Sequence, residues 1–133
     1  MSMRDYAYND YGLVLDEDTM KYMYAKAVGE QEADLYDMGY ALYEKGMCEY
    51  TGEFTGEASF IDDDGDDDWR ISESYSCDAI YYVPIRKYPS LFQAPYSNID
   101  EIVEEFKSKV GAYMPDGYDY RANIRHIVGT VFG

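Results

Sequence analysis

The strongest strand signals lie in residues 47–85, whose sequence is MCEYTGEFTGEASFIDDDGDDDWRISESYSCDAIYYVPI. Short runs of aromatic and β-branched residues alternate here with glycines and acidic clusters, a pattern typical of strands joined by turns. The aspartate-rich segment Asp62–Asp68 has Gly65 at its centre, and both residue types favour turns. We therefore predict an antiparallel meander with strands over Cys48–Phe54, Ala58–Ile61, Trp69–Tyr75 and Ala79–Ile85.

Two helices are predicted before this stretch. Asp16 or Asp18 can cap the first, whose apolar residues recur at the spacing of one helical face. The second is predicted from Glu30 to Lys45, with a glycine stop at Gly46. Its inward residues are expected to be Leu35, Met38 and Leu42. Its outer side is acidic and carries Glu30, Asp34, Asp37 and Glu44.

A third helix and a last strand follow the meander. Ser97 or Asn98 caps this helix, and its apolar face comprises Ile99, Ile102, Val103, Phe106 and Val110. The segment His126–Phe132 is apolar and β-branched, which favours a strand. Residues 1–133 are thus expected to form a single α+β domain. It would have two N-terminal helices, a central antiparallel sheet of about four or five strands, an amphipathic helix packed on the sheet and a C-terminal strand.

The charge of the chain is strongly negative and unevenly distributed. The net charge is −16, and residues 47–78 hold eleven acidic residues and one base. Such a chain repels nucleic acid and anionic membranes and attracts basic surfaces. The start of the chain is polar, and no stretch approaches the roughly 20 apolar residues of a membrane span. We therefore expect a cytoplasmic protein whose partner is a basic, nucleic-acid-binding protein.

The expected binding residues are acids with aromatic anchors among them. The chain contains 17 tyrosines, and a tyrosine ring offers rigid contact area with a hydroxyl at its rim. The alternative is that many of these rings are half-buried edges of the core. The partner-binding candidates are Glu30, Asp34, Asp37, Asp62, Asp63, Asp64, Asp66, Asp67, Asp68, Tyr50, Trp69 and Tyr75.

The aspartate cluster also admits a cation site or a solvated turn. Calcium takes six to eight oxygen ligands, which carboxylates supply. With Gly65 at the sixth position of an EF-hand loop, however, Phe60 would be first and Ile71 twelfth. These positions need Asp and Glu, so the spacing argues against an EF-hand.

Soft metal ligands are few, and they are Cys48, Cys77 and His126. Each is expected on or beside a strand of one sheet, so that they can converge on one structural zinc with Asp78 or another carboxylate as the fourth ligand. The alternative is two small buried thiols and a satisfied histidine. Two cysteines are too few for a disulfide framework.

Catalysis is not expected from this inventory. A cysteine–histidine pair or paired carboxylates are conceivable, but neither has a local signature. The sequence contains no glycine-rich phosphate loop, nucleophile elbow or HExxH. We therefore expect a binding protein, not an enzyme.

In size, acidity and lack of a catalytic motif, the chain resembles anti-CRISPR proteins and DNA-mimicking antirestriction proteins of phages and mobile elements. The resemblance is one of type, so it transfers no residue by position. It implies a stoichiometric inhibitor that acts in a bacterial host cell by occupying a basic nucleic-acid channel, such as that of a Cas9-type nuclease. The alternative is a zinc-binding structural or accessory protein of a phage or mobile element, without an inhibitory role.

Overall fold

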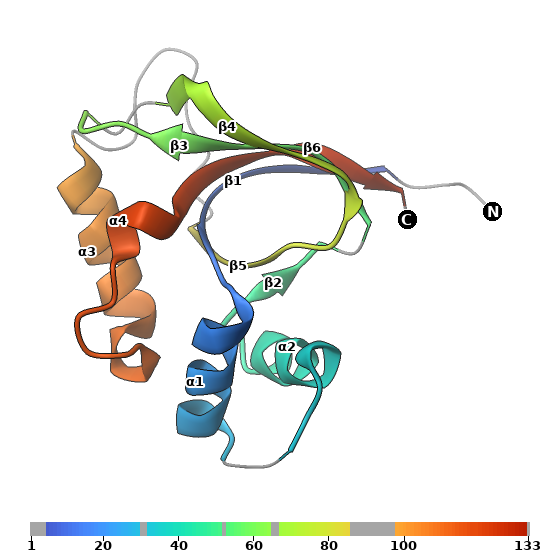
Figure 1. Cartoon of the computed structure of the whole chain (residues 1–133), viewed down its shortest axis with the longest axis vertical. Coiled ribbons are helices and arrows are strands. Elements are labelled where there is room, and N and C mark those ends of the chain that lie inside the picture. The colour runs from blue at the N-terminus through green and yellow to red at the C-terminus, as the bar shows by residue number, and fades with distance from the viewer. Residues whose placement is uncertain (1–4, 30–31, 52, 65–66, 86–97, 133) are drawn as a thin grey trace.

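The computed structural model describes residues 5–29, 32–51, 53–64, 67–85 and 98–132. Over these ranges the chain forms an α+β fold with one antiparallel sheet of six strands (Figure 1). The predicted class is therefore confirmed, with slightly more strands than expected. The elements are β1 (Asp5–Val14), α1 (Glu17–Ala27), α2 (Leu35–Glu44), β2 (Glu49–Tyr50), β3 (Phe54–Ile61), β4 (Asp67–Asp78), β5 (Tyr81–Ile85), α3 (Ile99–Val110), a 3-10 turn (Gly111–Tyr113), α4 (Tyr120–Asn123) and β6 (Ile124–Phe132).

The strand order is β2-β5-β1-β6-β3-β4, so the predicted meander is wrong. The two terminal strands, β1 and β6, occupy the middle of the sheet and pair from Asp5↔Phe132 to Leu13↔Ile124. They separate the β2–β5 pair from the β3–β4 hairpin. The segment predicted as one strand over Cys48–Phe54 is divided, because β2 pairs with β5 whereas β3 pairs with β4 and β6.

The strand β1 was not predicted, and it separates two hydrophobic cores. Tyr11 and Leu13 face the core between the sheet and the helices, where they meet residues such as Met20, Leu42, Ile102 and Phe106. Side chains alternate along a strand, so Asp10 and Gly12 face the opposite side. There the curled sheet encloses a second core of Phe54, Ala58, Ile80, Tyr82 and Ile127 (Figure 1).

The helix caps follow short-range signals. The Asp16 side chain accepts the Thr19 N–H at 2.8 Å, as predicted for α1. The helix α2 begins at Leu35 instead of Glu30, because the Asp34 side chain accepts the Asp37 N–H at 2.8 Å and so ends the preceding loop. It stops before Gly46, whose φ of +73° is the expected left-handed conformation.

The third predicted helix is confirmed as α3. The Asn98 side chain caps it by accepting the Glu101 N–H at 3.1 Å. Its buried residues Ile99, Ile102, Phe106 and Val110 form the predicted face toward the sheet. In the described ranges, no helix combines the length and apolar character needed to cross a membrane.

Alkaline pH is expected to destabilise the fold. Burial raises the pKa of Tyr118 to about 12, and burial together with the neighbouring Glu49 raises the pKa of Cys48 to about 12. Burial and the 2.8 Å hydrogen bond to Asp10 also raise the pKa of Tyr82. In the unfolded chain these groups lose their protons near pH 8.5 for cysteine and about 10 for tyrosine. Between those values and about 12, only the folded chain keeps the protons, so the free energy of unfolding falls as pH rises.

Urea unfolding at pH 7.5 and 10.5 measures this loss. We expect a lower midpoint at pH 10.5, and we expect Tyr118→Phe to decline less steeply than the wild type because it removes one of the raised groups. Equal midpoints for the wild type at both pH values would contradict the assignment.

Candidate partner-binding surface

The helix α2 exposes a stripe of three tyrosines. Tyr36, Tyr40 and Tyr43 are 57%, 55% and 50% exposed, and among the large hydrophobic residues of the described chain only Ile71 matches the lowest of these values. Their spacing of four and three residues places them on one helical face. Met38 and Leu42 lie on the other side and are buried, as predicted. The helix therefore uses its aliphatic side for the core and presents its aromatic side to solvent.

The strand β2 extends this stripe across the edge of the sheet. The Tyr50 ring meets the Tyr36 ring edge-on, with centroids 6.1 Å apart, and stacks on Tyr81 at 5.1 Å. Gly39 makes the close approach of α2 possible, because a Cβ there would lie 2.2 Å from the Tyr81 ring. We define the aromatic face as Tyr36, Tyr40, Tyr43, Tyr50 and Tyr81.

Carboxylates border the aromatic face. Asp37 and Glu44 are exposed on α2. Asp37 follows Tyr36 directly, and Glu44 follows Tyr40 by four residues. A hydrogen bond between Tyr40 and Glu44 raises the pKa of the Tyr40 hydroxyl. The segment 35–44 contains no lysine or arginine, so these carboxylates have no basic neighbour within α2. The face therefore combines aromatic area with negative charge.

An open groove adjoins the N-terminal end of α2. Its volume is about 780 Å³, and its lining includes Tyr24 and Met38 with the acids Asp34 and Asp37. Lys21 of α1 also lines the groove. The groove extends the acidic surface of α2 toward α1.

The aspartate segment forms a turn between β3 and β4, as predicted, but β4 begins at Asp67. Asp67 and Asp68 therefore lie in a strand and not in the turn, because they pair with Ile61 and Phe60 of β3. Asp66 lies outside the described residues, as do the side chains of Asp67 and Trp69.

Several carboxylates of this hairpin are engaged within the molecule. Asp63 pairs with Arg121, and its carbonyl accepts the Ile99 N–H at 3.0 Å. Asp62 accepts the Asp64 N–H at 2.9 Å. Asp68 lies 3.2 Å from the Arg70 side chain. The tip thus fastens the hairpin to the end of the molecule that contains α3 and α4, which leaves less of its charge for a partner.

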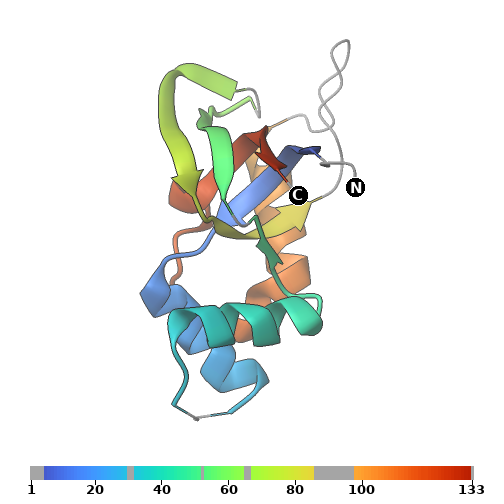
Figure 2. The same cartoon turned by 90° about the vertical axis from the view of Figure 1, so that its right-hand side faces the viewer.

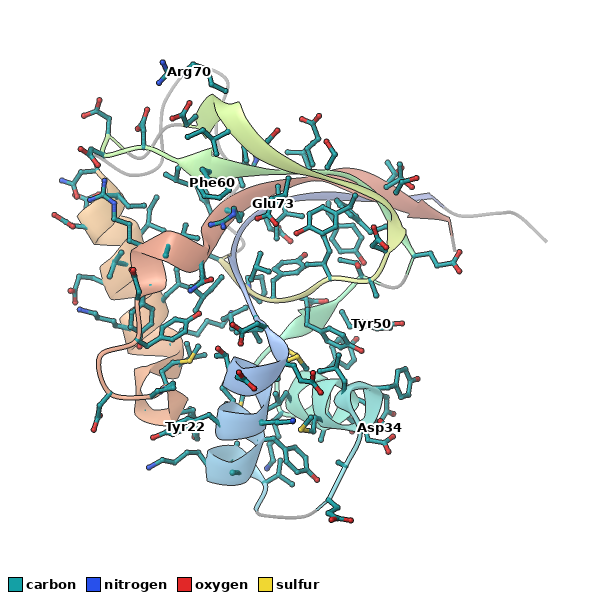
Figure 3. All side chains as sticks on the ribbon, in the orientation of Figure 1. Tyr22, Asp34, Tyr50, Phe60, Arg70 and Glu73 are labelled. Atoms are coloured by element: carbon teal, nitrogen blue, oxygen red, sulfur yellow. The ribbon has the colours of Figure 1, made fainter. Side chains whose placement is uncertain are left out.

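The two predicted groups of acids do not form one patch. The hairpin lies at one end of the long axis and α2 at the other (Figures 1 and 2). Asp34 and Arg70 mark these ends in Figure 3. The physical reason is the strand order, which puts β2 and β4 at opposite edges of the sheet.

The predicted aromatic anchors also separate. Tyr50 belongs to the aromatic face, but Tyr75 packs against Phe54 of the second core, with ring centroids 6.1 Å apart. Burial and the nearby Glu73 raise the Tyr75 pKa. Glu30 lies outside the described residues. Sequence reasoning missed Tyr36, Tyr40 and Tyr43, although their spacing opposite the buried stripe of α2 was a usable signal.

The predicted zinc ligands lie in separate parts of the sheet. Cys48 precedes β2, whereas His126 lies in β6, and β5 and β1 run between these strands. At about 4.8 Å per strand, β2 and β6 are roughly 14 Å apart. The buried Cys48 thiol donates to the Gly39 carbonyl at 3.6 Å, and the His126 ring packs 5.6 Å from the Tyr11 ring.

Cys77 lies in β4, near the irregularity opposite Phe54 and Thr55, and its side chain is not among those described. His126 pairs with Ser59, farther along β3. Over the described residues, no three His, Cys, Asp or Glu side chains gather as a metal site. The structural zinc therefore stays a prediction from sequence, and metal analysis of the purified protein tests it.

No protein-family model, curated protein or solved structure matches the chain. The functional argument therefore depends on the geometry and charge of the surfaces described above.

Proposed function

We propose that the protein is a stoichiometric inhibitor that binds the basic nucleic-acid channel of a host defence protein, with a Cas9-type nuclease as the first candidate. The observation that carries the proposal is the aromatic face, whose most exposed tyrosines lie beside carboxylates on a helix without bases. Exposed aromatic clusters rimmed by charge are typical of protein–protein interfaces. Inhibition by occupying the channel requires no catalytic step by this chain.

Charge complementarity supports a basic partner. The channel that holds the guide and target strands in a Cas9-type nuclease is positively charged. A protein of net charge −16 is attracted to such a channel and competes with nucleic acid for it. Tyrosine rings then supply the contact area that screened surface charges alone do not.

The combination of acids and tyrosine rings distinguishes the proposed inhibitor from a protein that only mimics phosphate groups. Acids at the rim accelerate association and lose effect as salt increases, since the screening length is about 8 Å at physiological ionic strength. Buried aromatic contacts slow dissociation and depend less on salt. A mixed surface is therefore expected to bind at physiological salt with moderate salt sensitivity.

A DNA-binding competition assay tests the proposal. Guide-loaded Cas9-type nuclease is mixed with labelled target DNA and increasing amounts of the protein at 150 mM salt. We expect the nuclease to lose its DNA binding when the protein is about equimolar with it. We also expect the protein concentration that halves DNA binding to rise with the DNA concentration. Unchanged DNA binding at a 100-fold excess of the protein would contradict this target.

A further inference from the structure

The structure contains an internal example of arginine bound between an aromatic ring and a carboxylate. The guanidinium carbon of Arg125 lies 3.5 Å from the centroid of the Phe60 ring. Its Nε is 3.0 Å from the Glu73 carboxylate, and a terminal nitrogen donates to the Ala122 carbonyl at 2.7 Å. Figure 3 labels Phe60 and Glu73 on the neighbouring strands β3 and β4. The arginine is buried by these contacts.

Two lysines of the described residues lie farther from the rings that they face. The ammonium of Lys26 is 5.8 Å from the Tyr22 centroid, and that of Lys107 is 5.8 Å from the Tyr120 centroid. The shorter ring distance of the arginine agrees with the chemistry of the two cations. A guanidinium is planar and weakly hydrated, so it can stack on a ring while donating in its own plane, whereas an ammonium is a strongly hydrated point charge.

The aromatic face holds the same two components without a cation. Tyr36 and Tyr40 supply rings, and Asp37 and Glu44 supply exposed carboxylates on the same helix. Among the described residues, no lysine or arginine lies over the rings of Tyr36, Tyr40, Tyr43 or Tyr50. Phe60 and Glu73 supply an aromatic ring and a carboxylate to Arg125. The same two groups are therefore present on α2 and accessible to another molecule.

We propose that the aromatic face is selective for arginine and binds an arginine-rich segment of the partner. A guanidinium stacks on a tyrosine ring, and its N–H groups donate to the adjacent Asp37 or Glu44 carboxylate. Successive tyrosines lie about one helical turn apart, roughly 5–6 Å, so neighbouring arginines can be bound in series. This inference rests on the proposed function, since it names the residues of the basic partner that the face recognises.

Two peptides of equal charge and length test the selectivity. Fluorescently labelled octa-arginine and octa-lysine are titrated with the folded protein at 150 mM salt, and binding is followed by fluorescence anisotropy. We expect at least tenfold tighter binding of octa-arginine. The variant Tyr36→Leu/Tyr40→Leu keeps apolar side chains without rings, and we expect it to bind the two peptides with similar affinity. The control Tyr22→Leu, on α1, is expected to keep the preference.

The outcomes separate the two proposals. Equal affinity of the wild type for both peptides overturns arginine selectivity and leaves a general basic partner. A tenfold preference that persists in Tyr36→Leu/Tyr40→Leu overturns the assignment to this face. Failure of both peptides to bind contradicts a basic partner and so contradicts the proposed function as well.

Discussion

Replacing Tyr36, Tyr40 and Tyr43 together with alanine is expected to weaken binding to the basic partner by about 100-fold or more. Truncating an aromatic hot-spot residue at the centre of an interface commonly weakens the binding free energy by about 2 kcal/mol or more. About 1.4 kcal/mol corresponds to a tenfold change in affinity. Two such residues among the three suffice for the expected loss. Titration of the labelled variant with guide-loaded nuclease measures it.

Stability serves as the control for this variant. The three side chains are each at least 50% exposed, so their truncation removes few core contacts. We expect the urea midpoint to change little, since exposed substitutions usually alter stability by about 0.5 kcal/mol or less each. Tyr22→Ala, outside the aromatic face, is the matched binding control. Full affinity of the triple variant would exclude the aromatic face as the binding site.

Phe54→Ala is expected to lower the free energy of unfolding by about 3–5 kcal/mol, the usual cost of deleting a fully buried phenylalanine ring. Phe54, on β3, is 0% exposed, and its ring packs against the rings of Tyr8 on β1 and Tyr75 on β4. Gly56 and Gly129 fit directly against it, because a Cβ at either position would lie within 2.7 Å of the ring. Such a rigid setting collapses poorly around a cavity, which favours a large loss.

Urea unfolding followed by circular dichroism measures this loss. Ile71→Ala is the matched control, because Ile71 is a large apolar residue on β4 with 50% exposure. We expect the control to change stability by less than about 1 kcal/mol. A similar small change for Phe54→Ala would show that the second core is not closely packed.

The helices could be predicted because their signals are local. Asp16 and Asn98 each cap a helix through a backbone N–H only three residues away. The apolar spacing of α3 likewise lies within 12 residues. The start of α2 was placed too early because the acidic residues before Asp34 are compatible with a helix, and only the capping hydrogen bond to Asp37 sets its boundary.

The strand order could not be predicted, because it depends on contacts between the two ends of the chain. Strand β1 does not show a simple alternation of apolar and polar residues. Asp10 is buried, and its carboxylate accepts a hydrogen bond from the Tyr82 hydroxyl. Gly12 leaves room for the Tyr82 and Ile127 side chains. A polar residue and a glycine thus occupy core positions, and their partners lie at least 70 residues away.

The candidate site was predicted only in part. Exposed acids on α2 were predicted, and Tyr50, which lies in the aromatic face, was among the expected anchors. The engagement of hairpin acids within the molecule could not be predicted, because partners such as Arg121 are distant in sequence. The aromatic face depends on α2 packing against Tyr81 through Gly39, a contact that joins residues 42 positions apart.

Photocross-linking compares the two ends of the molecule directly. A benzophenone side chain is placed at position 40 on α2 or at position 71 on β4, where the natural residues are 55% and 50% exposed. Each protein is irradiated with guide-loaded Cas9-type nuclease at 150 mM salt. We expect cross-linking from position 40 to a basic surface of the nuclease and little from position 71. Cross-linking from position 71 alone would contradict binding through the aromatic face.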